Sequence, residues 1–184
     1  MGIIGDGLEK AAARTATRPI PKSAGAQMRF LVKQFKGTKA VAQLLGVSQR
    51  TVERYVKGQI KKPRPELAAK LAGEVQQRWQ PRVRARAMKQ AATTGGITVE
   101  TRARFGFTAA PGSTDDSRMR RITQHLPPVY AQRLFDAHAA GAADTQLRDI
   151  VAEGLQEQYF RDGGRRAPGL VVEFTDIDYV ELDF

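Results

Sequence analysis

The chain of 184 residues contains no cysteine and only two histidines, His125 and His138. Without cysteine it can form neither a disulfide nor a thiolate metal site, which is typical of proteins in the reducing cytosol. The two histidines fall in different predicted elements, so their spacing does not indicate a metal site. No apolar run approaches the length needed to cross a bilayer, and the first residues lack the apolar core of a signal peptide. We therefore expect an intracellular protein with no membrane partner and no bound metal.

Lysine is absent after Lys89, and charge is distributed unevenly along the chain. Residues 1–94 contain 20 Lys and Arg against 5 Asp and Glu, whereas residues 95–184 contain 10 against 14. Charge that served only solubility would have its signs interspersed. The basic half therefore predicts binding to a polyanion such as nucleic acid, and the mildly acidic half predicts a different role.

Residues 38–60, TKAVAQLLGVSQRTVERYVKGQI, have the pattern of a DNA-binding helix-turn-helix. Gly46 interrupts the first helix and supplies the permissive backbone that a tight turn between helices needs. Ser48 follows as the expected cap of the second helix, because its hydroxyl accepts from the unpaired N–H groups of the first turn. The apolar positions of the two helices are Val41, Ala42, Leu45, Val47, Val52 and Tyr55.

With these apolar positions turned inward, Gln49, Arg50, Glu53, Arg54 and Lys57 face outward. Gln and Arg in the first turn of such a helix reach base edges in the major groove. The alternative interpretation is an ordinary pair of antiparallel helices with a solvated charged face. The DNA-binding residues that we predict are Ser48, Gln49, Arg50, Thr51, Arg54 and Lys57 of the motif, Lys61, Lys62 and Arg64 of the following loop, and Arg82, Arg84 and Arg86 of the helix beyond it.

The remaining pattern predicts three domains or segments. Residues 1–22 are expected to be a flexible segment with at most a short helix. Residues 23–94 are expected to form the helix-turn-helix domain, with a helix at 23–36 and a basic helical extension at 65–92 that is continuous or broken near Pro81. The stretch Thr93–Gly96 has the composition of a boundary, and residues 95–184 form the second domain.

In this second domain, residues 97–107 alternate like a strand, and residues 109–117 are dense in turn-forming residues. Helices are expected from about Asp116 to His125, from Pro127–Pro128, and from Asp144 to Phe160 with Asp144 as the cap. The chain ends in a strand that we expect to pair with residues 97–107. The fold class is thus mostly α with a small β element, an α+β protein with an N-terminal helix-turn-helix domain and a C-terminal α+β domain.

Two groups of residues in the second half invite a chemical interpretation. The final strand carries five carboxylates, which a metal or acid–base site would use, but alternating charge on a strand more often marks a solvated sheet face. The loop GSTDDS holds Ser113 and Thr114, yet Ser, Thr and Asp are also the preferred residues at a helix N-terminus. From the residues alone we favour the structural interpretation of both groups. The five carboxylates are Glu173, Asp176, Asp178, Glu181 and Asp183.

Taken together, the chain resembles the telomere terminal proteins of linear Streptomyces chromosomes and plasmids. The resemblance runs along the whole chain and includes MGIIGDGLEKAAARTATRP, TKAVAQLLGVSQRTVERYVKGQIKKPRPELA, FGFTAAPGSTDD and the acidic ending. It implies a protein primer: a side-chain hydroxyl accepts the first deoxynucleotide, and the protein stays covalently attached to the 5′ DNA end. The priming threonine of the family falls on Thr114, with Ser113 beside it as an alternative acceptor.

The resemblance also implies the partners and the location of the chain. Its partners would be telomeric DNA ends, a DNA polymerase and a telomere-associated protein, and it would lie in the cytoplasm at the nucleoid. The chain would be a substrate and not an enzyme, with no cofactor of its own, because the dNTP and the divalent metal come through the polymerase. Two alternatives stay open: a helix-turn-helix transcriptional regulator with a C-terminal dimerisation domain, and a recombination accessory protein.

Overall fold

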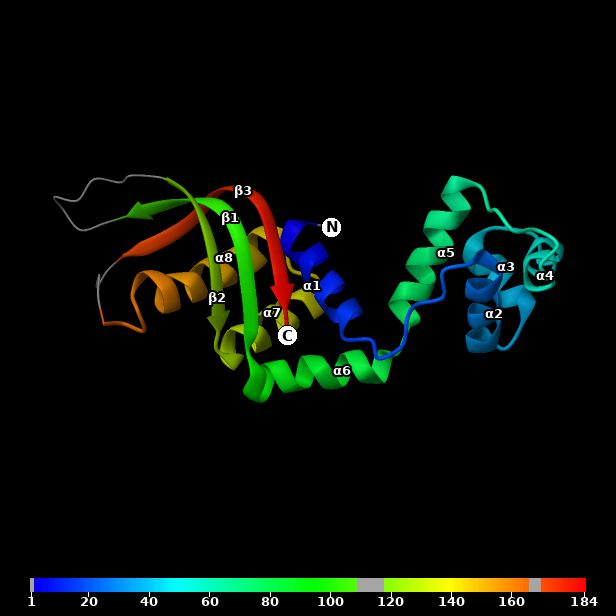
Figure 1. Cartoon of the computed structure of the whole chain (residues 1–184), viewed down its shortest axis with the longest axis horizontal. Helices are drawn as coiled ribbons and strands as arrows, with labels where there is room; N and C mark the ends of the chain where they lie inside the picture. Colours follow the sequence, from blue (N-terminus) through cyan, green and yellow to red (C-terminus); the bar gives the residue numbers. More distant parts are fainter. Residues whose placement is uncertain (1, 109–117, 166–169) are drawn as a thin grey trace. The chain divides into compact units, whose positions relative to one another are not determined.

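The computed structural model describes residues 2–108, 118–165 and 170–184, and the chain divides into two compact units. The helix-turn-helix unit comprises Ala16–Pro81, and the sheet unit comprises Met1–Thr15 together with Arg82–Phe184. The structure confirms a mostly helical α+β fold (Figure 1). No helix in the described ranges is long and apolar enough to cross a membrane.

Four helices build the helix-turn-helix unit: α2 (Ala24–Phe35), α3 (Thr38–Leu45), α4 (Gln49–Val56) and α5 (Pro65–Arg78). Met28, Val41, Val52 and Leu71, one from each helix, are fully buried in a shared core. The single tryptophan, Trp79, packs edge-on against Phe30 and donates its indole N–H to the carbonyl of Arg18 at 3.0 Å. The tryptophan is thus a packing residue of this unit.

The sheet unit is built on a three-stranded antiparallel sheet with strand order β2-β1-β3. Its strands are β1 (Ile97–Thr108), β2 (Arg118–Leu126) and β3 (Val171–Asp183). The final strand pairs with β1 as the sequence predicts, from Thr98 opposite Asp183 to Thr108 opposite Val171. The alternation of the strands places Val99, Phe105 and Leu126 in the core and leaves side chains such as Arg102 and Arg121 exposed on the opposite face.

Helices cover one face of this sheet (Figure 1). They are α1 (Ile3–Arg14), α7 (Pro128–Ala139) and α8 (Asp144–Leu155), and the segment α6 (Pro81–Gln90) with η1 (Ala91–Gly95) leads into β1. Another short segment, η2 (Gln156–Phe160), follows α8. Leu134 and Leu155 pack with the strands in a single apolar core.

The N-terminal residues differ from the flexible segment predicted for residues 1–22. Ile3–Arg14 is the helix α1, and its residues Ile4 and Leu8 are buried in the core of the sheet unit. The Asp144 carboxylate accepts the backbone N–H groups of Ile4 at 3.0 Å and Gly5 at 3.3 Å. Asp144 therefore caps α1, although the sequence predicts that it caps its own helix; Ala143 is the N-cap residue of α8.

Residues 118–126 form the strand β2, so the helix predicted for 116–125 is wrong. The buried residues Ile122 and Leu126 are four positions apart, a spacing that fits both a helix face and a strand face. Pairing with β1 decides between the two, because Thr101 lies opposite Ile122 and Ile97 lies opposite Leu126. Strand formation here depends on contacts distant in sequence.

The boundary predicted at Thr93–Gly96 also differs from the structure, in which the units meet at Thr15/Ala16 and Pro81/Arg82. Met88 and Ala91 pack into the core of the sheet unit, which binds this segment to the strand that follows. Gly96, at φ 72°, makes the turn into β1. The turn signal in the sequence is real, but it marks a change of element within one unit.

The cap on α1 leads to a prediction about stability. Burial raises the pKa of Asp144, but the N–H groups of Gly5 and Ile4 and the guanidinium of Arg148 outweigh it and lower that pKa below the ordinary value of an aspartate. Asp144→Ala should therefore lower the free energy of unfolding of the sheet unit at pH 7 by about 0.5–2 kcal/mol, the usual cost of a lost cap. Because the folded pKa is depressed, this contribution is present above the unfolded pKa and is lost as the pH falls through the folded value.

Urea unfolding at pH 7 and pH 3 measures this difference, and exchange of the Ile4 and Gly5 amide hydrogens should accelerate in the variant. Asp149→Ala, at an exposed position of the same helix, is the control and should change neither quantity. An equal difference in stability at both pH values would contradict a contribution from the ionised carboxylate.

Candidate nucleic-acid interface

The turn of the helix-turn-helix has the geometry that the sequence predicts. Gly46 ends α3 at φ 71°, a conformation that favours glycine. The Ser48 hydroxyl accepts the backbone N–H of Thr51 at 3.2 Å and caps α4. Val52 and Tyr55 are buried beneath the helix, at 0% and 4% exposure. The predicted orientation of α4 is thereby confirmed.

The outward face of α4 carries the predicted polar residues. Arg50 and Arg54, one helical turn apart, are exposed, and neither guanidinium has a hydrogen-bond or ion-pair partner among the described residues. Thr51 is half-buried, and its hydroxyl lies 2.9 Å from that of Ser48. Within the helix-turn-helix unit, the exposed members of the predicted set are Ser48, Gln49, Arg50, Arg54, Lys57, Lys61, Lys62 and Arg64.

Gln49 takes part in a hydrogen-bond network that the sequence analysis missed. Its amide nitrogen donates to Thr38 Oγ1 and to Glu53 Oε1, both at 3.0 Å. The pair Gln49 and Glu53 has the i, i+4 spacing at which helical side chains meet, so the sequence does contain this signal. Thr38 comes from the start of α3, and its approach follows only from how the two helices cross.

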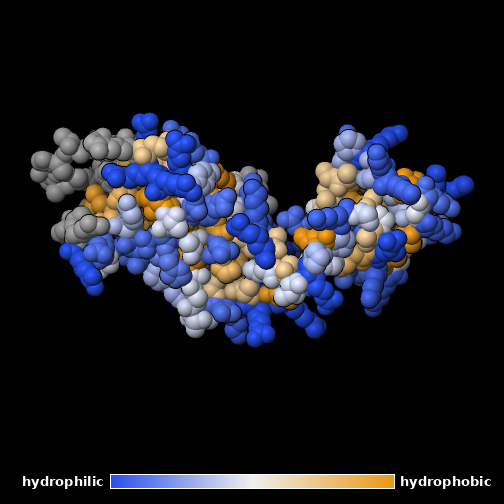
Figure 2. Space-filling model, viewed as in Figure 1, coloured by the Kyte–Doolittle hydropathy of each residue, from blue (hydrophilic) through white to orange (hydrophobic). Residues whose placement is uncertain are grey.

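The division into units sharpens the charge asymmetry. The helix-turn-helix unit holds 14 Lys and Arg against 3 Asp and Glu, a net charge of +11, whereas the remaining residues hold 16 of each sign. The whole net charge of the chain therefore belongs to one unit. Hydrophilic side chains project from the surface of this unit at the right of Figure 2. Such a surface attracts a polyanion and makes its binding depend on salt.

The sequence predicts that all three arginines of the basic helix α6 contact DNA, but in the structure one of them is held within the protein. Arg82 and Arg86 are exposed, but the side chain of Arg84 is only 13% exposed and forms an ion pair with Glu9 at 2.8 Å. The Glu9 carboxylate also lies 3.2 Å from His138 Nε2. Burial raises the pKa of Glu9, and the contacts with Arg84 and His138 more than offset it and lower that pKa. Arg84 thus joins α6 to α1 within the sheet unit.

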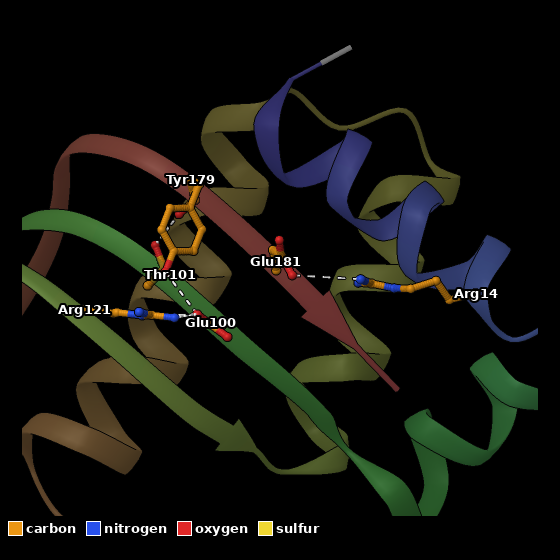
Figure 3. Close-up of polar contacts among 6 residues, drawn as sticks. All are labelled: Arg14, Glu100, Thr101, Arg121, Tyr179 and Glu181. Carbon is orange, nitrogen blue, oxygen red and sulfur yellow. Dashed lines mark hydrogen bonds and ion pairs between the residues drawn. The ribbon is translucent and has the colours of Figure 1, made fainter.

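Asp178 and Glu181 of β3 are exposed and take part in ion pairs. Asp178 pairs with Arg102 at 3.1 Å, and Glu181 lies 3.9 Å from Arg14. Figure 3 shows that Glu100 is central to a second group, in which it accepts from Arg121 at 2.6 Å and from the Tyr179 hydroxyl at 3.0 Å. These two hydrogen bonds, with that from Arg121 the stronger, lower the pKa of Glu100.

These pairings fit a solvated sheet face better than a catalytic site. Within the described part of the chain, no group of three or more His, Cys, Asp or Glu side chains is arranged to hold a metal ion. The proposed acceptors Thr114 and Ser113 lie outside the described residues, between β1 and β2 in the sequence.

Comparison with family models, with curated proteins and with solved structures found no match for this chain.

The exposed arginines of α4 generate the first prediction about DNA binding. Replacing Arg50 and Arg54 together by alanine should weaken binding of the full chain to a duplex selected from a random library by tenfold or more. An arginine that reads a guanine edge contributes about 1–3 kcal/mol. Fluorescence anisotropy measures the affinity. Arg133→Ala, which removes an ion pair with Glu153 in the sheet unit, is the control and should leave binding unchanged; unaltered binding by the double variant would refute the assignment of this face.

The charge of the helix-turn-helix unit leads to a second prediction. DNA affinity should fall steeply with salt, and replacing both Lys61 and Lys62 by alanine should reduce the slope of log K against log salt concentration by about 2. Each lost phosphate contact removes about 0.9 from that slope. Lys10→Ala, at an exposed position in the sheet unit, is the matched control. A similar reduction for Lys10→Ala would contradict the division of roles between the units.

Proposed function

We propose that this chain binds DNA through its helix-turn-helix unit and serves as the protein primer at the ends of a linear replicon. The observation that carries the DNA-binding part is the exposed, unpaired arginine face of α4, in a unit that holds the net charge of +11. The resemblance of the loop GSTDD to that of the telomere terminal proteins supports the priming part. The partners of the chain would be DNA ends, a DNA polymerase and a telomere-associated protein.

In the proposed reaction the chain is a substrate for the polymerase. The Thr114 hydroxyl oxygen attacks the α-phosphorus of a dNTP, a phosphodiester bond to the threonine forms, and pyrophosphate leaves. The hydroxyl proton passes to a base of the polymerase or to water. The divalent metal ions of the polymerase stabilise the charge on the phosphates. The 3′ hydroxyl of the attached nucleotide then receives the next one.

The alternative is a transcriptional regulator that uses the same helix-turn-helix unit and dimerises through the sheet unit. Both functions require the exposed face of α4, so loss of DNA binding does not separate them. Covalent nucleotide transfer does, because a regulator acquires no nucleotide.

Thr114→Ala should abolish transfer of a labelled deoxynucleotide to the protein, because the accepting oxygen is removed. The assay contains the full chain, telomeric 3′-overhang DNA, labelled dNTP and the host replication proteins, and counts label that stays on denatured protein. Thr114→Ser should retain part of the transfer, since its hydroxyl remains. Duplex binding should be unchanged in both variants.

Ser113→Ala is the matched control and should transfer nucleotide at the wild-type level. Mass spectrometry of the labelled protein identifies the modified residue. An adduct on Ser113 or on a tyrosine such as Tyr130 would reject the assignment to Thr114. Sequence-specific duplex binding with no transfer by the wild-type chain would favour the regulator.

A further inference from the structure

The network around Gln49 limits what the start of α4 can present to DNA. Gln49 is exposed on the first turn, and a glutamine side chain normally offers two donor hydrogens and one acceptor oxygen. The amide nitrogen has two acceptors within reach, Thr38 Oγ1 and Glu53 Oε1, each at 3.0 Å. Both donor hydrogens are therefore engaged inside the protein, and the amide oxygen remains for a ligand.

The carboxylate of Glu53 fixes the orientation of this amide. An ionised carboxylate only accepts hydrogen bonds, so the Gln49 nitrogen must face it and the oxygen must face away. The second carboxylate oxygen of Glu53 also stays an acceptor. Gln49 and Glu53 thus form an acceptor pair on the outward face of α4, defined by these two residues and held by Thr38.

The exposed arginines on the same face complete a mixed pattern. Arg50 follows Gln49, and Arg54 follows Glu53, so a donor side chain accompanies each member of the acceptor pair. In the major groove, cytosine N4 and adenine N6 are donors, whereas thymine O4 and guanine O6 are acceptors. An acceptor pair therefore accepts a hydrogen bond from cytosine or adenine and is repelled by the acceptor oxygen of thymine or guanine.

We infer that the acceptor pair selects a base with an exocyclic amino group, cytosine or adenine, at one position of the DNA site. The inference rests on the proposed DNA binding by the helix-turn-helix unit. Without the network, Gln49 has a donor and an acceptor and can make the two hydrogen bonds that specify adenine. Thr38 and Glu53 thereby broaden the preference from adenine alone to both amino bases.

The test begins with a duplex site selected by the full-length chain from a random library. Each position is then replaced by every base pair, and the amino base is replaced by an analogue without the amino group, purine for adenine or 2-pyrimidinone for cytosine. We expect one position at which thymine, guanine or the analogue weakens binding tenfold or more. Lys57→Ala, a matched control on the same helix, should weaken all sites by the same factor.

Two variants separate this inference from general DNA binding. Glu53→Gln supplies a donor, so the preference for amino bases at that position should fall to about twofold, while the other positions keep theirs. Thr38→Val keeps the shape of the side chain but releases one Gln49 hydrogen, and the preference should narrow to adenine. If the wild-type chain selects a site and both variants keep its base preferences, the inference is wrong and the proposed DNA binding stands. If the wild-type chain selects no site, sequence-specific DNA binding fails together with the inference.

Discussion

The docking of α1 is the contact on which the organisation of the chain depends. Ile4 and Leu8 bury their side chains in the core of the sheet unit, and the Asp144 carboxylate satisfies the N–H groups at the start of the helix. At the other side of α1, Glu9 pairs with Arg84 of α6. The chain thus leaves the sheet unit after α1 and returns to it at α6, so the helix-turn-helix unit is an insertion with two covalent connections.

The arginines of the two units differ in whether they have acidic partners. Arginines of the sheet unit are used in ion pairs, such as Arg84 with Glu9 and Arg133 with Glu153. In the helix-turn-helix unit the carboxylates are few, and no acidic partner meets Arg50 or Arg54 among the described residues. Unpaired cations keep their full attraction for phosphates and base edges, whereas a paired arginine must first give up its partner. Arg50 therefore differs from Arg84 in being free to contact DNA, although α6 is the more basic of the two helices in sequence.

Sequence reasoning succeeded where the determining contacts are local. The turn at Gly46, the cap at Ser48 and the buried side of α4 each follow from residues within a few positions, and the structure confirms them. It failed where distant residues decide. Residues 118–126 form a strand because they pair with β1, where Thr101 and Ile97 lie opposite Ile122 and Leu126. Likewise, Asp144 caps α1, whose first residues lie 140 positions away in sequence. For the candidate site the same rule holds: the outward face of α4 was predictable, but the contact of Thr38 with Gln49 required the crossing of two helices.

In the proposed function, DNA binding and acceptance of the first nucleotide belong to different units. DNA would be bound by Ala16–Pro81, whereas Thr114 lies in the sequence between β1 and β2 of the sheet unit. A hydroxyl that is consumed by a covalent bond cannot also serve as a lasting DNA contact, so a primer gains from keeping the recognition surface on another unit. A regulator has no such requirement, since its second unit needs only to dimerise or bind an effector. The chemistry of a single hydroxyl, and not the presence of the helix-turn-helix, is therefore what distinguishes the two functions.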